Sequence, residues 1–196
     1  KAYVAPDFQI NTLLDDGPDP IPNPLAINFY TLGYDFNKKL TELNPATKQN
    51  LQNYLSYYRI LTDAVNIKNA YIVNIGVEFE IIVLPNYNSN EVLLKCIDAL
   101  KKYFNIDRMG INKPIVLTDV YVLLDKVDGV QSVVRPDKDG MGGLQIVNKS
   151  GGNYSSNKYG IKNATRDGIV YPPKDPTCFE VKYPDVDIKG RVVSLF

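Results

Sequence analysis

Apolar and polar residues alternate with a period of two between residues 71 and 84, where the sequence is YIVNIGVEFEIIVL. The odd-numbered positions are apolar or aromatic throughout. The even-numbered positions include four polar or small residues: Asn74, Gly76, Glu78 and Glu80. Successive side chains of a β-strand point to opposite faces of the sheet, so this pattern predicts a strand with one face against a core.

Spacings of three and four predict a helix on each side of this strand. The first begins with Asn44 as N-cap and Pro45 at the first helical position. Its face would comprise Leu51, Tyr54, Leu55, Tyr58, Leu61, Thr62 and Val65, which predicts a long helix of about 30 Å. The second begins at Asn88, with Glu91 three residues later in a pattern like a capping box. Its face would comprise Leu93, Ile97, Leu100 and Phe104.

A third, shorter helix is predicted after Pro114, with Thr118 as its N-cap. Its apolar face would comprise Val120, Leu123, Leu124 and Val127. Gly129 would end it, because glycine adopts the left-handed conformation that closes many helices. Residues 130–134, VQSVV, then predict a returning strand.

The flanking regions contain more turn residues. Prolines alternate through Asp15–Leu25 and predict a stiff connector, and residues 25–36 predict a strand and a turn. Gly, Asn, Ser and Asp are frequent in residues 135–160, which predicts exposed loops or an irregular hairpin. CFEVKY and GRVVSLF are two further strand candidates, separated by the turn-prone PDVDIK.

Together these elements predict an α+β fold built around a two-layer unit, with both shorter helices on one face of the sheet. We divide the chain into three parts. Residues 1–66 hold the connector, a strand and the long helix, residues 67–135 form the compact strand-helix-helix-strand unit, and residues 136–196 form a loop-rich, mostly β extension.

The charge balance and the absence of histidine exclude several classes of function. The chain has 196 residues, 22 basic and 22 acidic side chains, and no histidine. The scattered charges argue against a nucleic-acid partner, and no apolar run approaches the ~20 residues of a membrane-spanning helix. Without histidine, Ser-His-Asp and Cys-His sites and the common zinc sites are excluded. The start KAYVAPDF, without Met or a leader, predicts a fragment of a longer chain.

Two cysteines, Cys96 and Cys178, are too few for a disulfide framework and suggest a reducing compartment. A bond between the two stays open at this stage.

Glu78 and Glu80 are the main candidates for catalysis. Their Cα atoms would lie roughly 6.5–7 Å apart on one side of a strand, near the carboxylate spacing of glycosidases. Their neighbours Asn74 and Gly76 are polar or small, and the chain has no tryptophan to hold a sugar. We therefore favour a solvated or partner-facing sheet surface.

Two other motifs are weaker. Ser155–Lys158 matches S-x-x-K and Lys149–Gly151 matches its companion, but their order is reversed and both lie in a glycine-rich segment. Asp137–Gly140 begins like a calcium loop, but its glycine falls at the fourth position and the twelfth residue is Asn148. The sequence thus predicts no catalytic, cofactor or metal site.

The 14 tyrosines are more suggestive. Tyrosine is enriched at protein interfaces. Tyr54, Tyr58 and Tyr71 fit predicted core faces. The predicted interface residues are Glu78, Glu80, Tyr154, Tyr159 and Tyr171.

Three tracts carry a resemblance to a known family: NYLSYYRILTDAVNIKNAYIVNIGVEFEI, NYNSNEVLLKCIDALKKYFNIDRMGINKPIVLTDVYVLLDKVDGVQSV and FEVKYPDVDIKGRVV. They resemble the C-terminal region of the baseplate wedge subunit of T-even-type contractile-tailed bacteriophages, which is grouped with the baseplate J-like proteins. The resemblance extends from about Leu25 to Val193 and is weakest between Arg135 and Asn163.

The resemblance implies a late, structural virion protein of the tail baseplate, without enzymatic activity or cofactor and assembled in the host cytoplasm. In that family two wedge subunits join another wedge protein, six wedges surround a hub, and C-terminal regions of neighbouring copies pair into a ring. The ring stays connected while the baseplate rearranges before sheath contraction. The implied partners are copies of itself, as a homodimer and in the ring, and other wedge proteins.

Our hypothesis is that the polar strand face, the long helix and the loop-rich C-terminal third share these contacts, most simply by isologous pairing. Two alternatives remain. The Tyr-, Asn- and Gly-rich loops would also suit a receptor- or carbohydrate-binding tail module, and Glu78 with Glu80 could serve a hydrolase.

Overall fold

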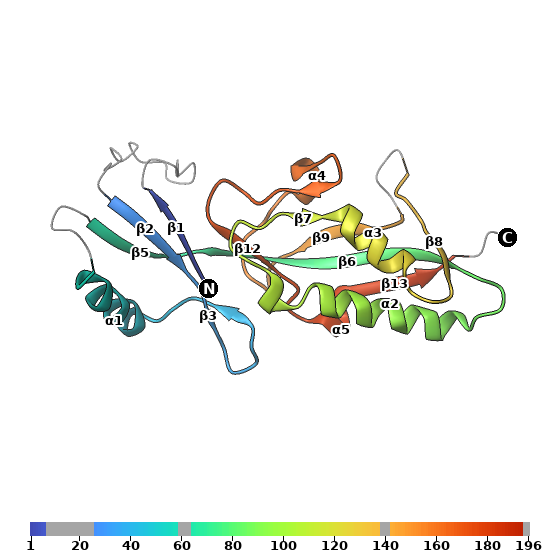
Figure 1. Ribbon diagram of the computed structural model, residues 1–196, viewed down its shortest axis with the longest axis horizontal. Helices are drawn as coiled ribbons and strands as arrows, with labels where there is room; N and C mark the ends of the chain where they lie inside the picture. The colour runs from blue at the N-terminus through green and yellow to red at the C-terminus, as the bar shows by residue number, and fades with distance from the viewer. Residues whose placement is uncertain (7–25, 59–63, 138–141, 194–196) are drawn as a thin grey trace. The chain divides into compact units, whose positions relative to one another are not determined.

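A computed structural model of the chain describes residues 1–6, 26–58, 64–137 and 142–193 (Figure 1). The proline-rich connector at Asp15–Leu25, the helix positions Leu61 and Thr62, and most of the calcium-like motif lie outside the described residues. Helices and strands are mixed along the chain, which confirms the α+β class.

The chain divides into two compact units. The first comprises Lys1–Ile72, Gly110–Asn112 and Pro172–Cys178, and the second comprises Val73–Met109, Lys113–Tyr171 and Phe179–Phe196. The three-part division made from the sequence stays a prediction.

The first unit is built on a three-stranded sheet in the order β1-β2-β5. Its strands are β1 (Ala2–Pro6), β2 (Ala26–Thr31) and β5 (Ala64–Asn69). β1 runs antiparallel to β2, and β5 runs parallel to it. A short hairpin, β3 (Gly33–Tyr34) and β4 (Leu40–Thr41), follows β2 and confirms the predicted strand and turn.

Helix α1 (Pro45–Ser56) begins where the sequence predicts. The Asn44 side chain accepts a hydrogen bond from the Thr47 N–H at 2.7 Å, and Pro45 opens the helix. The prediction of a long helix is wrong, because α1 ends at Ser56 and Val65 lies on β5. Pairing with β2 satisfies the backbone of residues 64–69, and this tertiary pairing prevails over helical spacing.

The second unit is organised around β6 (Tyr71–Val83). β8 (Val130–Val133) and β9 (Gln145–Lys149) run antiparallel to β6, and β13 (Ile188–Val192) runs parallel to it. β12 (Thr177–Glu180) also pairs with β6. The predicted alternation is confirmed over its centre, where the buried side chains are Val73, Ile75, Val77, Phe79 and Ile81. Tyr71, predicted on the core face, is 41% exposed.

Helices α2 (Ser89–Tyr103) and α3 (Leu117–Asp125) cover this sheet. α2 contacts β13 and α3, and α3 contacts β8, so the predicted helical layer is present. Asn88 caps α2 as predicted, but Thr118 does not cap α3, which begins one residue earlier without a side-chain cap. Gly129 has the expected positive φ of 96°.

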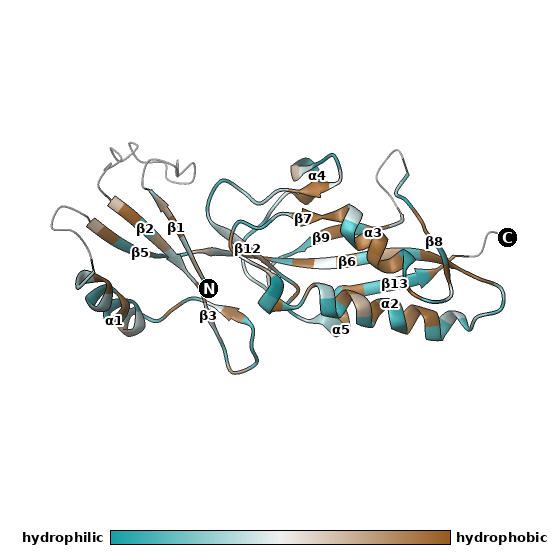
Figure 2. Ribbon diagram, in the orientation of Figure 1, coloured by the Kyte–Doolittle hydropathy of each residue, from teal (hydrophilic) through white to brown (hydrophobic). Residues whose placement is uncertain are grey.

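The buried stripe of α2 agrees with the prediction at Leu100 and Phe104 and is shifted by one position in the first half of the helix. The buried side chains are Val92, Cys96, Leu100 and Phe104, whereas Leu93 and Ile97 are half-buried. Both sets have helical spacing, so the sequence pattern alone does not choose between them. Figure 2 shows apolar and polar residues alternating along the visible side of α2.

The C-terminal third contains more regular structure than predicted. β9 arises within the segment expected to be loops or an irregular hairpin. Further short elements follow: α4 (Ile161–Ala164), β10 (Thr165–Arg166) and β11 (Ile169–Val170). Two others, η2 (Ile106–Arg108) and β7 (Ile115–Val116), lie earlier in the chain, between α2 and α3. The tail strands are confirmed as β12 and β13, but PDVDIK is not simply a turn, because it forms α5 (Pro184–Asp187) and the start of β13. None of the helices in the described part of the chain is long and apolar enough to cross a membrane.

Candidate functional site

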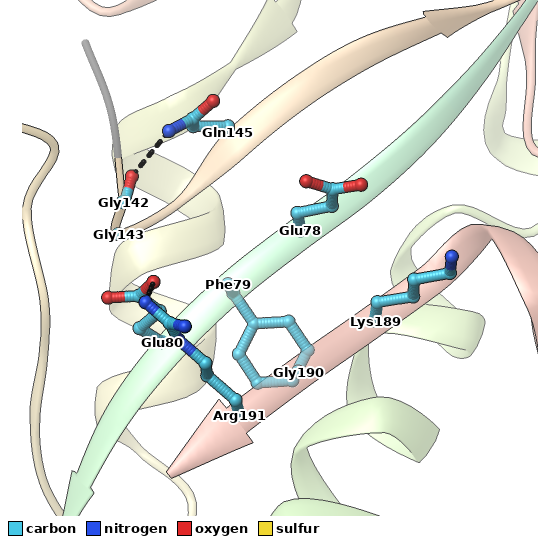
Figure 3. A pocket seen from close by; sticks show the side chains of 9 residues that line it. All are labelled: Glu78, Phe79, Glu80, Gly142, Gly143, Gln145, Lys189, Gly190 and Arg191. Carbon is cyan, nitrogen blue, oxygen red and sulfur yellow. Dashed lines mark hydrogen bonds and ion pairs between the residues drawn. The ribbon is translucent and has the colours of Figure 1, made fainter. Parts of the chain in front are cut away.

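The two glutamates of the candidate pair lie in an open groove on the polar face of β6 (Figure 3). The groove has a volume of about 360 Å³. Glu78 is in register with Lys189 of β13 and with Gln145 of β9, and Glu80 is in register with Arg191. The structure therefore brings together two acidic and two basic side chains from strands far apart in the sequence.

Glu80 is held by an ion pair. Its Oε1 lies 2.6 Å from Nη2 of Arg191, and the Glu80 side chain is 14% exposed against 72% for Arg191. Gly142 closes over the carboxylate, since a Cβ there would lie 3.4 Å from Glu80 Oε2. A carboxylate engaged in this way is not free to act as the proton donor of a hydrolase.

Glu78 differs from its neighbour. It is half-buried, and within the described residues its carboxylate has neither a hydrogen bond nor an ion pair. The exposed ammonium of Lys189 is likewise without a partner there, although it is in register with Glu78. The groove thus offers one free carboxylate and one free ammonium to a molecule that lies against it.

The other end of the same strand face is covered by residues 148–159. Asn74 is 1% exposed. Its Nδ2 donates to Glu180 Oε2 at 2.8 Å, and its Oδ1 accepts from the Ser155 N–H at 2.7 Å. Asn148 Nδ2 donates to the Asn74 carbonyl at 3.1 Å, and Asn148 Oδ1 accepts from the Tyr159 N–H at 3.2 Å. The Gly- and Asn-rich segment is therefore hydrogen-bonded onto the sheet.

Tyr154 is anchored inside the second unit. Its hydroxyl donates to Oδ1 of the buried Asp187 at 2.6 Å, and its ring meets Tyr183 edge to face at 5.5 Å. The hydrogen bond to the carboxylate, with burial adding to it, raises the pKa of Tyr154 to about 12. Oδ2 of Asp187 accepts from the Tyr183 N–H at 2.8 Å. These internal contacts explain Tyr154 without a partner protein.

Tyr159 also has an internal role. Its hydroxyl donates to the Tyr171 carbonyl at 2.8 Å, its ring lies 6.1 Å from that of Phe179, and burial raises its pKa. Tyr171 itself remains 46% exposed. The roles of Glu78, Glu80, Tyr154, Tyr159 and Tyr171 in an interface stay predictions.

A second group of tyrosines lies at the C-terminal end of α1 in the first unit, with Tyr54 on the helix and Tyr57 and Tyr58 just after it. Tyr54, Tyr57 and Tyr58 are 59%, 85% and 72% exposed. The hydroxyls of Tyr54 and Tyr58 are 3.3 Å apart and hydrogen-bonded, and their rings are tilted by 50°. The placing of Tyr54 and Tyr58 on a core face is wrong.

The cysteines and the remaining motifs supply no reactive centre in the described part of the chain. Cys96 and Cys178 are buried free thiols, and burial raises the pKa of Cys96 to about 11. Ser155 lies in a loop rather than on a helix. Among the described residues, no three acidic, Cys or His side chains gather as metal ligands.

No protein-family model and no curated protein matches the chain. Among solved structures, it is similar to a chain of the cryo-EM structure of the anti-feeding prophage (AFP) baseplate, 6-fold symmetrised. The identity is 14% and the TM-score is 0.45, over 79% of this chain and 29% of that chain. The chain thus spans less than a third of the length of that baseplate chain. A likeness at this level assigns no function.

Proposed function

We propose that this chain is a structural component of the baseplate of a contractile tail, of the wedge-subunit type. In this role it pairs with neighbouring copies to form a ring that stays connected while the baseplate rearranges before sheath contraction. Its partners are copies of itself and other wedge proteins, it works in the virion, and it needs no cofactor. The proposal is supported by the resemblance of residues 25–193 to the wedge-subunit family.

The structural observation that carries the proposal is the surface of α1. Most helices in folded proteins are stabilised by packing an apolar face. None of the 12 residues of α1 is buried. Its least exposed side chains, Lys48, Leu51 and Leu55, are only half-buried. Three exposed tyrosines at the end of such a helix, Tyr54 on it and Tyr57 and Tyr58 just after it, suit a surface that another protein covers.

The groove at Glu78 and Glu80 suits binding better than catalysis. A hydrolase needs a carboxyl group shielded from water that protonates the leaving group. Here Glu80 is ion-paired with Arg191, and Glu78 lies in an open, polar groove. The alternating charges instead suit contact with another charged protein surface.

Sedimentation velocity over a concentration series tests the proposal. We expect the mass to rise with concentration, and we expect Tyr57→Ser with Tyr58→Ser to weaken association about tenfold or more, as loss of central aromatic contacts does. Tyr34→Ser, at an exposed tyrosine of the same unit outside α1, is the control and should leave association unchanged. Circular dichroism checks that each variant is folded.

A strict monomer at the highest concentration would contradict pairing through this chain.

The exposed ring of Tyr171 favours a second candidate, a carbohydrate-binding tail module, because sugars stack on exposed aromatic rings. Binding on a glycan array that is lost in Tyr171→Ser, together with a strict monomer, would decide for that function.

A further inference from the structure

A second groove lies between α2 and α3, within the second unit and apart from the polar face of β6. Its volume is about 470 Å³. On α2 it is lined by Lys95, Asp98, Ala99, Lys102 and Tyr103. These positions follow a spacing of three and four, so they form one stripe along the helix. From Lys95 to Tyr103 the stripe is about 12 Å long at 1.5 Å per residue, which is the length of about two helical turns.

The floor of this groove is apolar. Ala99 comes from α2, and Leu123 and Val127 come from α3 and the residues just after it. All three are half-buried, so the floor is partly open.

The rim of the groove is positively charged. Its basic residues are Lys95, Lys102, Arg108 and Lys126, against the acidic Asp98 and Asp128. Two of these charges are engaged elsewhere, because Lys95 pairs with Glu91 at 2.6 Å and Asp98 lies 3.8 Å from Lys101. Within the described residues, Lys102, Arg108 and Lys126 have no ion pair. A chain of zero net charge therefore carries a local positive excess around an apolar floor.

We propose that this groove binds an acidic amphipathic helix of a partner protein. The apolar side of that helix would cover Ala99, Leu123 and Val127, and its carboxylates would meet Lys102, Arg108 and Lys126. Helices commonly dock into apolar grooves in this way, and charge complementarity selects the partner. Nucleic acid fits less well, because three unpaired basic side chains around an apolar floor are few for a phosphate backbone. This inference is independent of the proposed function.

The test uses the full chain and a fluorescein-labelled helical peptide of Leu, Glu and Ala, with Leu at every third and fourth position. Fluorescence anisotropy should show saturable binding that weakens as salt is added. Lys102→Glu with Lys126→Glu should weaken binding about tenfold or more, since two attractive pairs become repulsive. Lys158→Glu with Lys162→Glu, two exposed lysines of the same unit outside the groove, is the matched control and should change binding less than about twofold.

A second variant tests the floor separately. Ala99→Gln keeps helix propensity but adds a polar side chain to the floor, and it should weaken binding about threefold or more. A thermal melt followed by circular dichroism checks the fold of each variant.

Four results would overturn the proposal. The first is that the peptide does not bind at concentrations up to about 1 mM. The second is that a Glu-Ala peptide without Leu binds as tightly as the test peptide, and the third is that a peptide with Lys in place of Glu does so. The fourth is that a single-stranded oligonucleotide binds more tightly than the acidic peptide. The second result would leave only non-specific charge attraction, and the fourth would assign the rim to nucleic acid.

Discussion

The two ends of one strand face in the second unit meet opposite environments. At one end of the polar face of β6, Asn74 is 1% exposed and hydrogen-bonded on every side. At the other end, Glu78 and Glu80 line an open groove, and Glu78 has no partner within the described residues. Only three residues separate Asn74 from Glu78, and both point to the same side of the strand.

The difference shows what makes a polar position on a sheet suitable for burial. An amide is neutral and satisfies its donors and acceptor with a few fixed neighbours, here Glu180 and Ser155. A carboxylate keeps a full charge, and burying it without a partner is far more costly. The covered end therefore stabilises the fold, whereas the open end remains accessible for contacts with other molecules.

The largest expected effect comes from breaking the covered end. Asn74→Ala removes the donor to Glu180 and the acceptor for the Ser155 N–H, which leaves buried polar groups unsatisfied. We expect a loss of about 3 kcal/mol in the free energy of unfolding. Urea denaturation followed by circular dichroism measures it. A loss below about 0.5 kcal/mol would mean that the segment does not depend on this amide.

The next largest effect is expected at Tyr154, which anchors the segment 148–159 that covers Asn74. Tyr154→Phe keeps the ring against Tyr183 but removes the hydroxyl that donates to Asp187. We expect a loss of about 2 kcal/mol, because hydrogen bonds to charged groups are the stronger ones. Tyr159→Phe is the matched control. It removes a bond to a neutral carbonyl and should cost about 1 kcal/mol or less in the same denaturation assay.

The Tyr154 contact also predicts a pH dependence. The pKa of Tyr154 is raised from 10.0 to about 12 in the folded chain, because the protonated hydroxyl donates to Asp187. The folded state thus favours the neutral phenol. The stability it contributes is complete below pH 10.0 and is lost as the pH rises toward about 12. Other tyrosines titrate in this range, so the measurement is the difference between wild type and Tyr154→Phe in urea denaturation. A difference that stays constant with pH would contradict this contact.

A smaller effect is expected at the open end. Arg191→Gln removes the ion pair with Glu80, whose side chain is 14% exposed. We expect a loss of about 1 kcal/mol at low ionic strength, because Arg191 is solvated and gains little from the pair. The loss should shrink as salt is added. Thermal denaturation at two salt concentrations measures both, and a loss that is unaffected by salt would argue against an electrostatic cause.

The smallest effect is expected for Glu78→Gln. This carboxylate has no partner among the described residues, so replacing it with an isosteric amide should change the free energy of unfolding by less than about 0.5 kcal/mol. Urea denaturation measures this change. A loss as large as that of Asn74→Ala would remove the distinction between the covered and the open end.

Local signals in the sequence identified several elements correctly. The alternation in residues 73–81 located the buried face of β6, and the caps at Asn44 and Asn88 located the starts of α1 and α2. These features depend on neighbouring residues alone. The candidate pair Glu78 and Glu80 was also placed correctly on one polar face. Arg191, which pairs with Glu80, and Lys189, which is in register with Glu78, lie more than 100 residues away and could not be found from spacing.

Other features needed the folded chain. β9 forms where Gly, Asn and Ser indicated loops, because β6 offers it a ladder of backbone hydrogen bonds. The buried stripe of α2 starts at Val92 rather than at Leu93, because packing against both β13 and α3 decides which side chains are covered. Tyr154 and Tyr159 hold a segment of their own chain through contacts that the sequence pattern did not indicate.

The sequence by itself determined the α+β class, the polarity of the two faces of β6 and the positions where α1 and α2 begin, because periodicity and capping act over a few neighbouring residues. Tertiary structure alone decided where α1 ends, which polar residues of β6 are covered, and which basic side chains meet the glutamates. These outcomes depend on contacts between distant segments, whose hydrogen bonds and ion pairs form only after the strands have paired.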